Sequence, residues 1–177
     1  GLEAQGEGPR CALISRLTVQ KGLWLILEAA AQMMQDRAQL IVLGSGDRTL
    51  EQAFKDLQRH YPGQISVRLG FDEALAHRMI AGSDLILVPS LFEPCGLTQM
   101  YGMRYGCLPL VHLVGGLSDT VQPWSLCPGG HAGRNPSANG FGFSVHRLEE
   151  FLSCWREMLA CWRDQPQWHQ LQRQAMS

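Results

Sequence analysis

The sequence predicts an α/β domain built on a Rossmann-like, doubly wound parallel sheet. Short, fully apolar runs of the kind that form buried parallel strands recur along the chain. Amphipathic segments with helical spacing alternate with these runs, and glycine-rich loops follow several of them. Such alternation predicts right-handed βαβ units, with helices on both faces of one parallel sheet.

Length and charge fit one domain and exclude several classes of protein. The 177 residues carry 15 Lys+Arg and 16 Asp+Glu, a formal net charge of −1, so charge gives no reason to expect a nucleic-acid partner. Hydrophobic residues make up 45% of the chain, which favours a packed core over a disordered tail. No apolar run reaches the roughly 18–20 residues of a membrane span, so we expect no membrane partner.

The first half of the chain predicts three strands and three helices. A stripe of apolar residues at i, i+3, i+4 and i+7 begins at Leu23, and the helix that carries it should start near Lys21. Asp47 and Thr49 are side chains that can cap the second helix. In chain order we expect a strand at 11–15, a helix at 21–35, a strand at 40–43, a helix from 47 or 49, a strand at 65–69 and a short helix at 72–81.

The second half continues this alternation and then breaks it. We expect a strand at 85–89, a helix at 97–105, strands at 108–114 and 141–145, and C-terminal helices within 147–176. The Pro/Gly/Ser/Asn-rich stretch 122–140 is long for a loop, which indicates a functional, mobile or inserted segment. The polar, glycine-rich residues 1–9 have no basic and apolar signal-peptide regions, and we interpret them as a flexible lead-in.

The six cysteines show no C-x-x-C pair and no zinc-site spacing. A chain this large and apolar needs no disulfides, so we expect a reducing compartment with most thiols buried. Cys95 is the exception, because it follows a predicted strand in a functional-looking loop. The chain has no Asp-x-Asp pair, and we expect no metal site.

Ligands of doubly wound sheets bind at the carboxyl ends of the strands, near the point where the strand order reverses. The stretches that follow the predicted strands should therefore meet at one edge of the sheet. They are 15–22, 44–47, 70–71, 90–98 and 114–120.

Two features at this edge suit an anion. Arg16 and Lys21 follow the first strand, and two cations beside free helix N–H groups favour phosphate or diphosphate. The alternative is two solvated surface cations. The run from Gly96 to Thr98 offers a second helix start, where glycine allows close approach of a ligand, although such a glycine also serves ordinary turns.

Other residues at the edge have two interpretations each. Glu93 could accept hydrogen bonds from sugar hydroxyls or cap the following helix. Phe71 could stack on a base or lie in the core. We interpret Gly44-x-Gly46 as a turn, because the third glycine of a dinucleotide fingerprint is absent. The six histidines are scattered singly, and none receives a catalytic role.

Four segments, in this order, carry a family resemblance: Ser-Arg-Leu-Thr-Val-Gln-Lys-Gly at 15–22, Gly-Ser-Gly-Asp at 44–47, Pro-Ser-Leu-Phe-Glu-Pro-Cys-Gly-Leu-Thr-Gln at 89–99 and Gly-Gly-Leu-Ser-Asp-Thr-Val at 115–121. The chain resembles the C-terminal half of bacterial-type glycogen synthases and plant starch synthases. That family has the GT-B fold, in which the active site lies between two Rossmann-like domains. Its members transfer glucose from ADP-glucose to an α-1,4-glucan with retention of configuration.

The resemblance implies a role for several residues. Arg16 and Lys21 match the diphosphate-binding pair, and Glu93 matches the glutamate that contacts the donor glucose; we expect these three to act in catalysis. The substrate-binding positions implied are Phe71 beside adenine, where Tyr is usual, then Cys95, Gly96 and Leu97 against the glucose, and Thr98 near the distal phosphate. The wider retaining group has a second glutamate eight positions after the first, and Tyr101 stands there, a departure shared with the glycogen and starch synthases.

The resemblance also implies what the chain lacks. No metal or cofactor is required if cations and helix N–H groups neutralise the diphosphate. The family's Lys-Thr-Gly-Gly-Leu loop and N-terminal domain have no match in residues 1–177, so we interpret the chain as one nucleotide-sugar-binding domain of a longer enzyme. It should bind ADP-glucose without elongating glucan, whose main site lies in the missing domain. The implied location is cytoplasmic, or plastidic in a plant.

Three other functions stay open at this point. One is a GT-B transferase that uses a UDP-sugar, and another is a non-catalytic nucleotide-binding module. The third is half of a nicotinamide-dependent oxidoreductase, which is disfavoured because Gly44 stands where an acidic ribose-binding residue should end the second strand.

Overall fold

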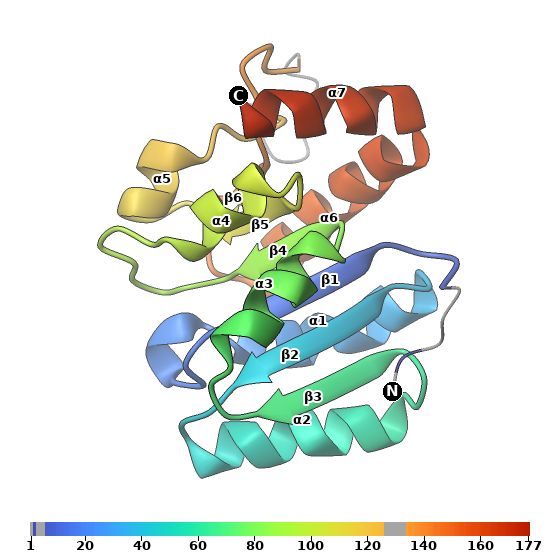
Figure 1. Ribbon diagram of the computed structural model, residues 1–177, viewed down its shortest axis with the longest axis vertical. Helices are drawn as coiled ribbons and strands as arrows, with labels where there is room; N and C mark the ends of the chain where they lie inside the picture. The colour runs from blue at the N-terminus through green and yellow to red at the C-terminus, as the bar shows by residue number, and fades with distance from the viewer. Residues whose placement is uncertain (1, 3–5, 126–133) are drawn as a thin grey trace.

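The chain forms a six-stranded parallel sheet covered by helices on both faces, shown in Figure 1 as a computed structural model. The structure describes residues 2, 6–125 and 134–177. The strand order is β3-β2-β1-β4-β5-β6, and each neighbouring pair runs parallel. The predicted doubly wound fold class is therefore confirmed.

All six predicted strands are present; the first and fourth end one residue earlier than predicted, and the last two end two residues earlier. The strands are β1 (Arg10–Ile14), β2 (Gln39–Gly44), β3 (Ile65–Leu69), β4 (Leu85–Val88), β5 (Leu108–His112) and β6 (Phe141–Phe143). The helices are the 3₁₀ turn η1 (Val19–Lys21), α1 (Trp24–Gln35), α2 (Arg48–His60), α3 (Glu73–Ala81), α4 (Thr98–Arg104), α5 (Gly116–Thr120), α6 (Leu148–Arg163) and α7 (Gln165–Met176).

Two apolar layers hold the helices on the sheet. In Figure 1, α3 and α4 lie in front of the strands, and α1 and α6 lie behind them. The larger buried cluster joins α1, α2, α6 and α7 to one face of the sheet. The smaller cluster joins α3 and α5 to the other face. Because strand side chains alternate between faces, neighbouring residues such as Ala12 and Leu13 belong to different clusters.

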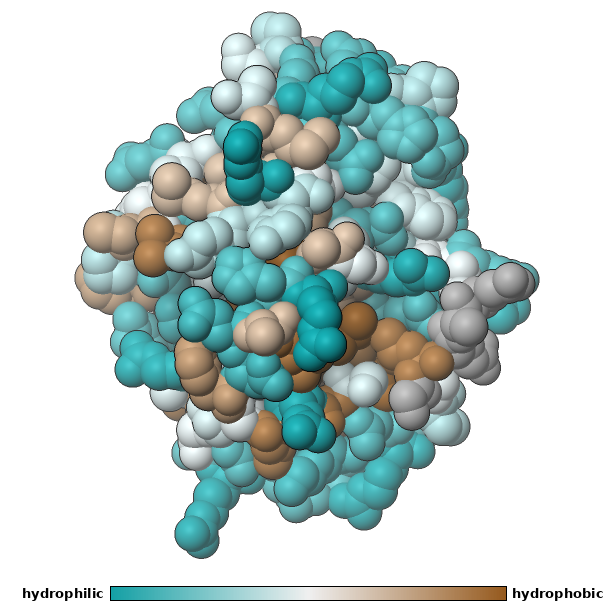
Figure 2. All heavy atoms as spheres, viewed as in Figure 1, coloured by the Kyte–Doolittle hydropathy of each residue, from teal (hydrophilic) through white to brown (hydrophobic). Residues whose placement is uncertain are grey.

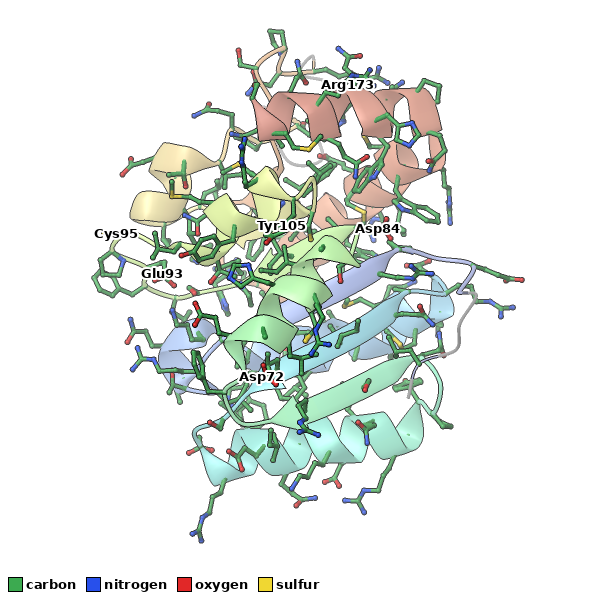
Figure 3. The ribbon with its side chains drawn as sticks, viewed as in Figure 1. Asp72, Asp84, Glu93, Cys95, Tyr105 and Arg173 are labelled. Carbon is green, nitrogen blue, oxygen red and sulfur yellow. The ribbon has the colours of Figure 1, made fainter. Side chains whose placement is uncertain are left out.

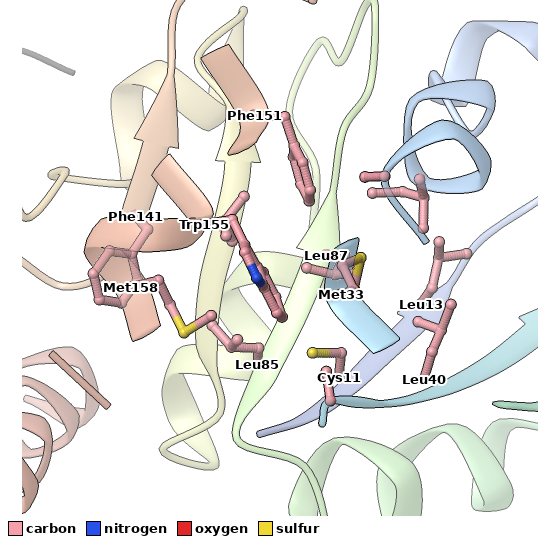
Figure 4. Close-up of a cluster of buried hydrophobic side chains, with 14 of the residues drawn as sticks. Cys11, Leu13, Met33, Leu40, Leu85, Leu87, Phe141, Phe151, Trp155 and Met158 are labelled. Atoms are coloured by element: carbon pink, nitrogen blue, oxygen red, sulfur yellow. The ribbon is translucent and has the colours of Figure 1, made fainter. Parts of the chain in front are cut away.

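Helix α6 anchors the larger cluster, as Figure 4 shows. Its Trp155 is fully buried among core residues that include Met33 and Leu85. The Trp155 indole Nε1 also donates a hydrogen bond of 2.9 Å to Asp36 Oδ2, at the end of α1. Truncation of such a tryptophan to alanine typically costs about 3–5 kcal/mol, so the C-terminal helices are part of the domain.

Local chemistry explains several helix boundaries. Asp47, not Thr49, caps α2, and its side chain accepts hydrogen bonds from the N–H groups of Thr49 and Leu50. Helix α5 was not predicted, because a five-residue helix carries too few apolar positions to show a helical stripe. In the expected lead-in, Gly8 and Pro9 are buried rather than free, and Pro9 O accepts a hydrogen bond of 3.0 Å from Gln39 N.

The cysteines follow the prediction where the structure describes them. Burial raises the pKa of each of the four core thiols, Cys11, Cys107, Cys154 and Cys161. Cys95 is exposed, and Cys127 lies outside the described residues, as does 126–133 of the predicted loop. In the described part of the chain, no helix has both the length and the apolar character needed to cross a membrane.

Candidate functional site: a cation and carboxylate edge at the strand ends

The site lies where the strand order reverses, between β1 and β4. These two strands are neighbours in the sheet, and the segments that follow them emerge at the same edge. A cavity of about 290 Å³ opens there. It is lined by residues from the ends of β1, β2 and β3 and from the start of α4: Ile14, Ser15, Arg16, Leu43, Gly44, Ser45, Gly70, Phe71, Asp72, Ala76 and Thr98.

A second, smaller pocket of about 20 Å³ continues this edge. Lys21 and Glu93 line it together with Thr98, which also lines the larger cavity. Arg16, Lys21 and Thr98 therefore lie on the same side of the molecule, as the strand-end argument predicts. Figure 3 shows Glu93 and Cys95 on the loop between β4 and α4.

An ion pair joins the two segments of the edge. Lys21 Nζ lies 2.6 Å from Glu93 Oε2, and the side chains are 17% and 12% exposed. The same carboxylate oxygen accepts a hydrogen bond of 3.0 Å from Ser90 Oγ. The helix that follows Glu93 has Leu97 at its N-cap, with no side-chain cap hydrogen bond. The capping interpretation of Glu93 is therefore wrong, and its carboxylate is instead held by Lys21 and Ser90.

Lys21 lies near a helix start, as predicted, but α1 begins three residues later than the predicted boundary. Lys21 is the last residue of η1, and α1 begins at Trp24. The chain turns at Gly22, which ends η1 with a φ of +65° and lies just before the helical stripe. A Cβ at this position would lie 2.0 Å from Pro89 O. The positive charge that Lys21 brings to the site is thus that of its ammonium group alone.

Close backbone packing fixes the loop from Glu93 to Leu97. A Cβ at Gly115 would lie 2.2 Å from Glu93 O, and one at Gly116 would lie 2.2 Å from Cys95 O. Gly116 N donates a hydrogen bond of 3.0 Å to Glu93 O. The buried side-chain amide of Gln99 donates a hydrogen bond of 3.2 Å to Cys95 O. The paired glycines thus let α5 approach the loop closely enough to hold it.

Exposed side chains complete the edge. Phe71 is 90% exposed, so its core interpretation is wrong, and the ring is free to stack at the mouth of the larger cavity. Arg16 and Cys95 are exposed as well. In Figure 2, hydrophobic residues gather at the left of the molecule, over the β4–α4 loop; the exposed large residues of this loop are Leu91, Phe92 and Leu97.

Ser90 and Gln99 are site residues that sequence reasoning missed. Both are almost fully buried and both bond to the loop that carries Glu93. The position of Ser90 at the end of a fully apolar strand was a usable signal, because buried hydroxyls need partners. Among the described residues, no group of three or more His, Cys, Asp or Glu side chains is arranged to hold a metal ion.

The sequence of the chain is similar to those of known glycosyltransferases. The family model "Glycosyl transferases group 1" matches residues 2–156. A glycogen synthase of Yersinia pestis (strain Pestoides F) is 47% identical over 176 residues, which are 99% of this chain and 36% of the relative. A glycogen synthase of Yersinia enterocolitica is 46% identical over the same share of both chains. The chain thus spans about a third of the length of the curated relatives it matches.

Solved structures show the same architecture. The catalytic domain of starch synthase IV from Arabidopsis thaliana, bound to ADP and acarbose, superposes with a TM-score of 0.89 at 32% identity. The match covers 100% of this chain and 36% of that one, in its C-terminal GT-B domain. Anabaena Alr3699/HepE in complex with UDP-glucose gives a TM-score of 0.75 at 18% identity, covering 96% and 43% of the two chains. At that identity the likeness concerns the fold alone.

Proposed function

Because the chain belongs to the group 1 glycosyltransferases, we propose that it binds the nucleotide-sugar donor of a retaining glucosyltransferase, with ADP-glucose as the donor. The reaction it serves is elongation of an α-1,4-glucan, as in the glycogen and starch synthases it resembles. The observation that carries the proposal is the joint edge at which Arg16, Lys21 and Thr98 line two adjoining pockets.

The proposed binding mode assigns each part of the donor to a part of this edge. Adenine stacks on Phe71, whose side chain is 90% exposed. The diphosphate lies between Arg16 and Lys21. The glucose lies against Glu93 and against the backbone of Cys95, Gly96 and Leu97 in the β4–α4 loop. The ADP in the Arabidopsis starch synthase IV structure supports a nucleoside diphosphate of this class.

Lys21 connects the sugar and phosphate parts of the site. An ammonium group has three N–H donors, and the ion pair with Glu93 uses one of them. The remaining donors are able to reach a phosphate oxygen while the first holds the carboxylate. The glucose contact and the diphosphate contact are therefore mechanically coupled through one side chain.

The chemistry requires the site to stabilise a leaving group. The acceptor hydroxyl attacks the anomeric carbon, the bond from that carbon to the β-phosphate oxygen breaks, and its electron pair leaves with ADP. The hydroxyl proton passes to the departing phosphate on the same face. Arg16 and Lys21 stabilise the negative charge that develops there, and preorganised charges of this kind lower barriers more than most other effects. No protein nucleophile or metal takes part in this scheme.

Calorimetric titration of the chain with ADP, UDP, ADP-glucose and UDP-glucose tests the proposal. We expect binding of the adenine nucleotides, with tighter binding of ADP-glucose than of ADP. A clear preference for the uridine nucleotides would replace the donor assignment with a UDP-sugar. The absence of binding to all four would overturn the donor-site proposal. Undiminished ADP-glucose binding in Glu93→Ala would remove Glu93 from the site.

A further inference from the structure

Two histidines that are far apart in the sequence meet beside Pro89 and Ser90, in the segment that leads to Glu93. His112 ends β5, and His146 follows β6. Their ring centroids lie 5.2 Å apart in an edge-to-face arrangement. His112 is only 7% exposed and stacks on Phe143 at 5.3 Å. Sequence reasoning treated the histidines as isolated, and the fold corrects that interpretation.

Each imidazole is bonded to one carbonyl of the segment that leads to Glu93. His112 Nδ1 lies 2.8 Å from Ser90 O, and His146 Nε2 lies 2.9 Å from Pro89 O. A carbonyl oxygen only accepts hydrogen bonds, so the hydrogen must lie on Nδ1 in His112 and on Nε2 in His146. The two rings therefore use different nitrogens for the same task.

The position of these carbonyls explains why side-chain donors are needed. The ladder between β4 and β5 ends at the pair Val88–Val111. Pro89 and Ser90 come next, where strand pairing no longer supplies N–H donors to their buried carbonyls. An unpaired buried carbonyl is costly. The two histidines supply the missing donors and so fix the backbone at the point where the chain leaves the sheet.

The two histidines are linked to the segments that carry both residues of the ion pair, Glu93 and Lys21. Ser90, whose carbonyl is held by His112, donates through Oγ to Glu93 Oε2. His146 also lies against the end of the Lys21 turn, because a Cβ at Gly22 would come within 2.5 Å of His146 Nε2. The histidine pair thus lies behind the Glu93 segment and the Lys21 segment together.

We propose that His112 and His146 are positioning residues that hold Pro89 and Ser90 so that Glu93 and Lys21 face the donor sugar and diphosphate. The proposal rests on the function proposed above. Neither ring lines the donor cavities, so the pair acts through the backbone and through Ser90 and does not touch the donor. Loss of either hydrogen bond should weaken recognition of the glucose part while leaving ADP binding nearly intact.

Crossed amide substitutions test this proposal, because the two histidines donate from different ring positions. The Asn amide reaches the place of Nδ1, and the Gln amide reaches the place of Nε2. We expect His112→Asn and His146→Gln to keep the preference for ADP-glucose over ADP. The mismatched variants, His112→Gln and His146→Asn, should lose roughly two- to tenfold of that preference, the size of one hydrogen bond. Calorimetry with both nucleotides measures it.

Amide hydrogen exchange supplies a readout that needs no ligand. The N–H groups of Leu91 and Gly116 donate to Gln20 O and Glu93 O, and both should exchange faster in the mismatched variants than in the matched ones. Should a mismatched variant fail to fold, Ser90→Ala, which removes only the hydroxyl that holds Glu93, must show the same selective loss of ADP-glucose binding.

The outcomes separate this inference from the proposed function. If all four variants bind and exchange like the wild type, or if ADP and ADP-glucose weaken in parallel, the positioning role is overturned. If the wild type binds neither nucleotide, the proposed function fails, and exchange at Leu91 and Gly116 still decides whether the histidines hold the segment. If the Asn and Gln variants of the same histidine show equal amide exchange rates, the hydrogen-bond assignment is refuted.

Discussion

The ion pair between Lys21 and Glu93 leads us to predict that removing the Glu93 charge increases the affinity for ADP. A phosphate oxygen bonded to Lys21 Nζ lies about 3 Å from it. Since Nζ is 2.6 Å from Glu93 Oε2, that phosphate can be no farther than about 6 Å from the carboxylate. The carboxylate therefore repels the diphosphate, and its neutral isostere in Glu93→Gln should bind ADP more tightly than the wild type does.

The separation sets the size of the effect. At about 6 Å, two unit charges repel by about 0.7 kcal/mol at the dielectric constant of water and by about 3 kcal/mol at an effective value of about 20. The side chains of the pair are 17% and 12% exposed, which places the site between these limits. Even the smaller repulsion corresponds to a change of roughly threefold in affinity. We expect at least that gain for ADP, and a loss of the extra affinity that glucose confers.

Titration calorimetry at low and high salt measures this change. The gain should shrink as salt increases, because screening weakens the repulsion that the substitution removes. Glu28→Gln makes the same change in net charge at an exposed position on α1 that lines neither donor pocket, and should leave ADP affinity unchanged. If Glu93→Gln binds ADP equally or more weakly at low salt, the phosphate is not beside Lys21 and the placement of the diphosphate is wrong.

Three further predictions concern other parts of the edge. Phe71→Ala should weaken ADP binding by about 1–3 kcal/mol, as for other base–aromatic stacks, without changing inorganic diphosphate binding or the melting temperature, because the ring is 90% exposed. Gly115→Ala should lower the melting temperature by several degrees in thermal unfolding, because its φ of +50° and the approach of Glu93 O both oppose a side chain. Gly82→Ala is the control, because Gly82 has a φ of −94° and a Cβ there would lie 3.3 Å from its nearest neighbour, Arg78 O, so it should cost less than Gly115→Ala. Burial raises the pKa of Cys161 to about 11, so labelling mapped by mass spectrometry should find it unreactive at pH 7–8 and Cys95 modified. Rapid labelling of Cys161 near neutral pH would contradict its burial.

The strands and the direction of the site could be predicted because they depend on local patterns. A fully buried strand is a run of apolar residues, and every residue of β4 is apolar and buried. Once the strands alternate with helices, the handedness of the connections leaves few arrangements, and all of them bring the segments after β1 and β4 to one edge. The cap at Asp47 follows from its own side chain and the next two N–H groups.

The parts that escaped prediction depend on contacts between distant segments. Helix α1 starts late because Gly22 adopts a left-handed conformation against Pro89 O, a contact that no local pattern encodes. The histidine contacts join residues 22 and 57 positions apart. A sequence pattern reports periodicity within one segment, whereas these partners are selected by which strand ends happen to be neighbours in the folded sheet.

The late start of α1 changes where the affinity for a diphosphate must originate. If Lys21 were the first residue of a long helix, the backbone N–H groups and the helix dipole would attract the diphosphate together with its ammonium group. It instead ends a three-residue turn, and the helix that Thr98 begins has only seven residues. In the proposed binding mode, we therefore expect the Arg16 and Lys21 side chains to supply most of the affinity for the diphosphate. In the proposed site, Glu93 offsets the charge of Lys21, and the two histidines bond to the Ser90 and Pro89 carbonyls just before it. We therefore expect the charge balance of the donor edge to depend on the segment after β4.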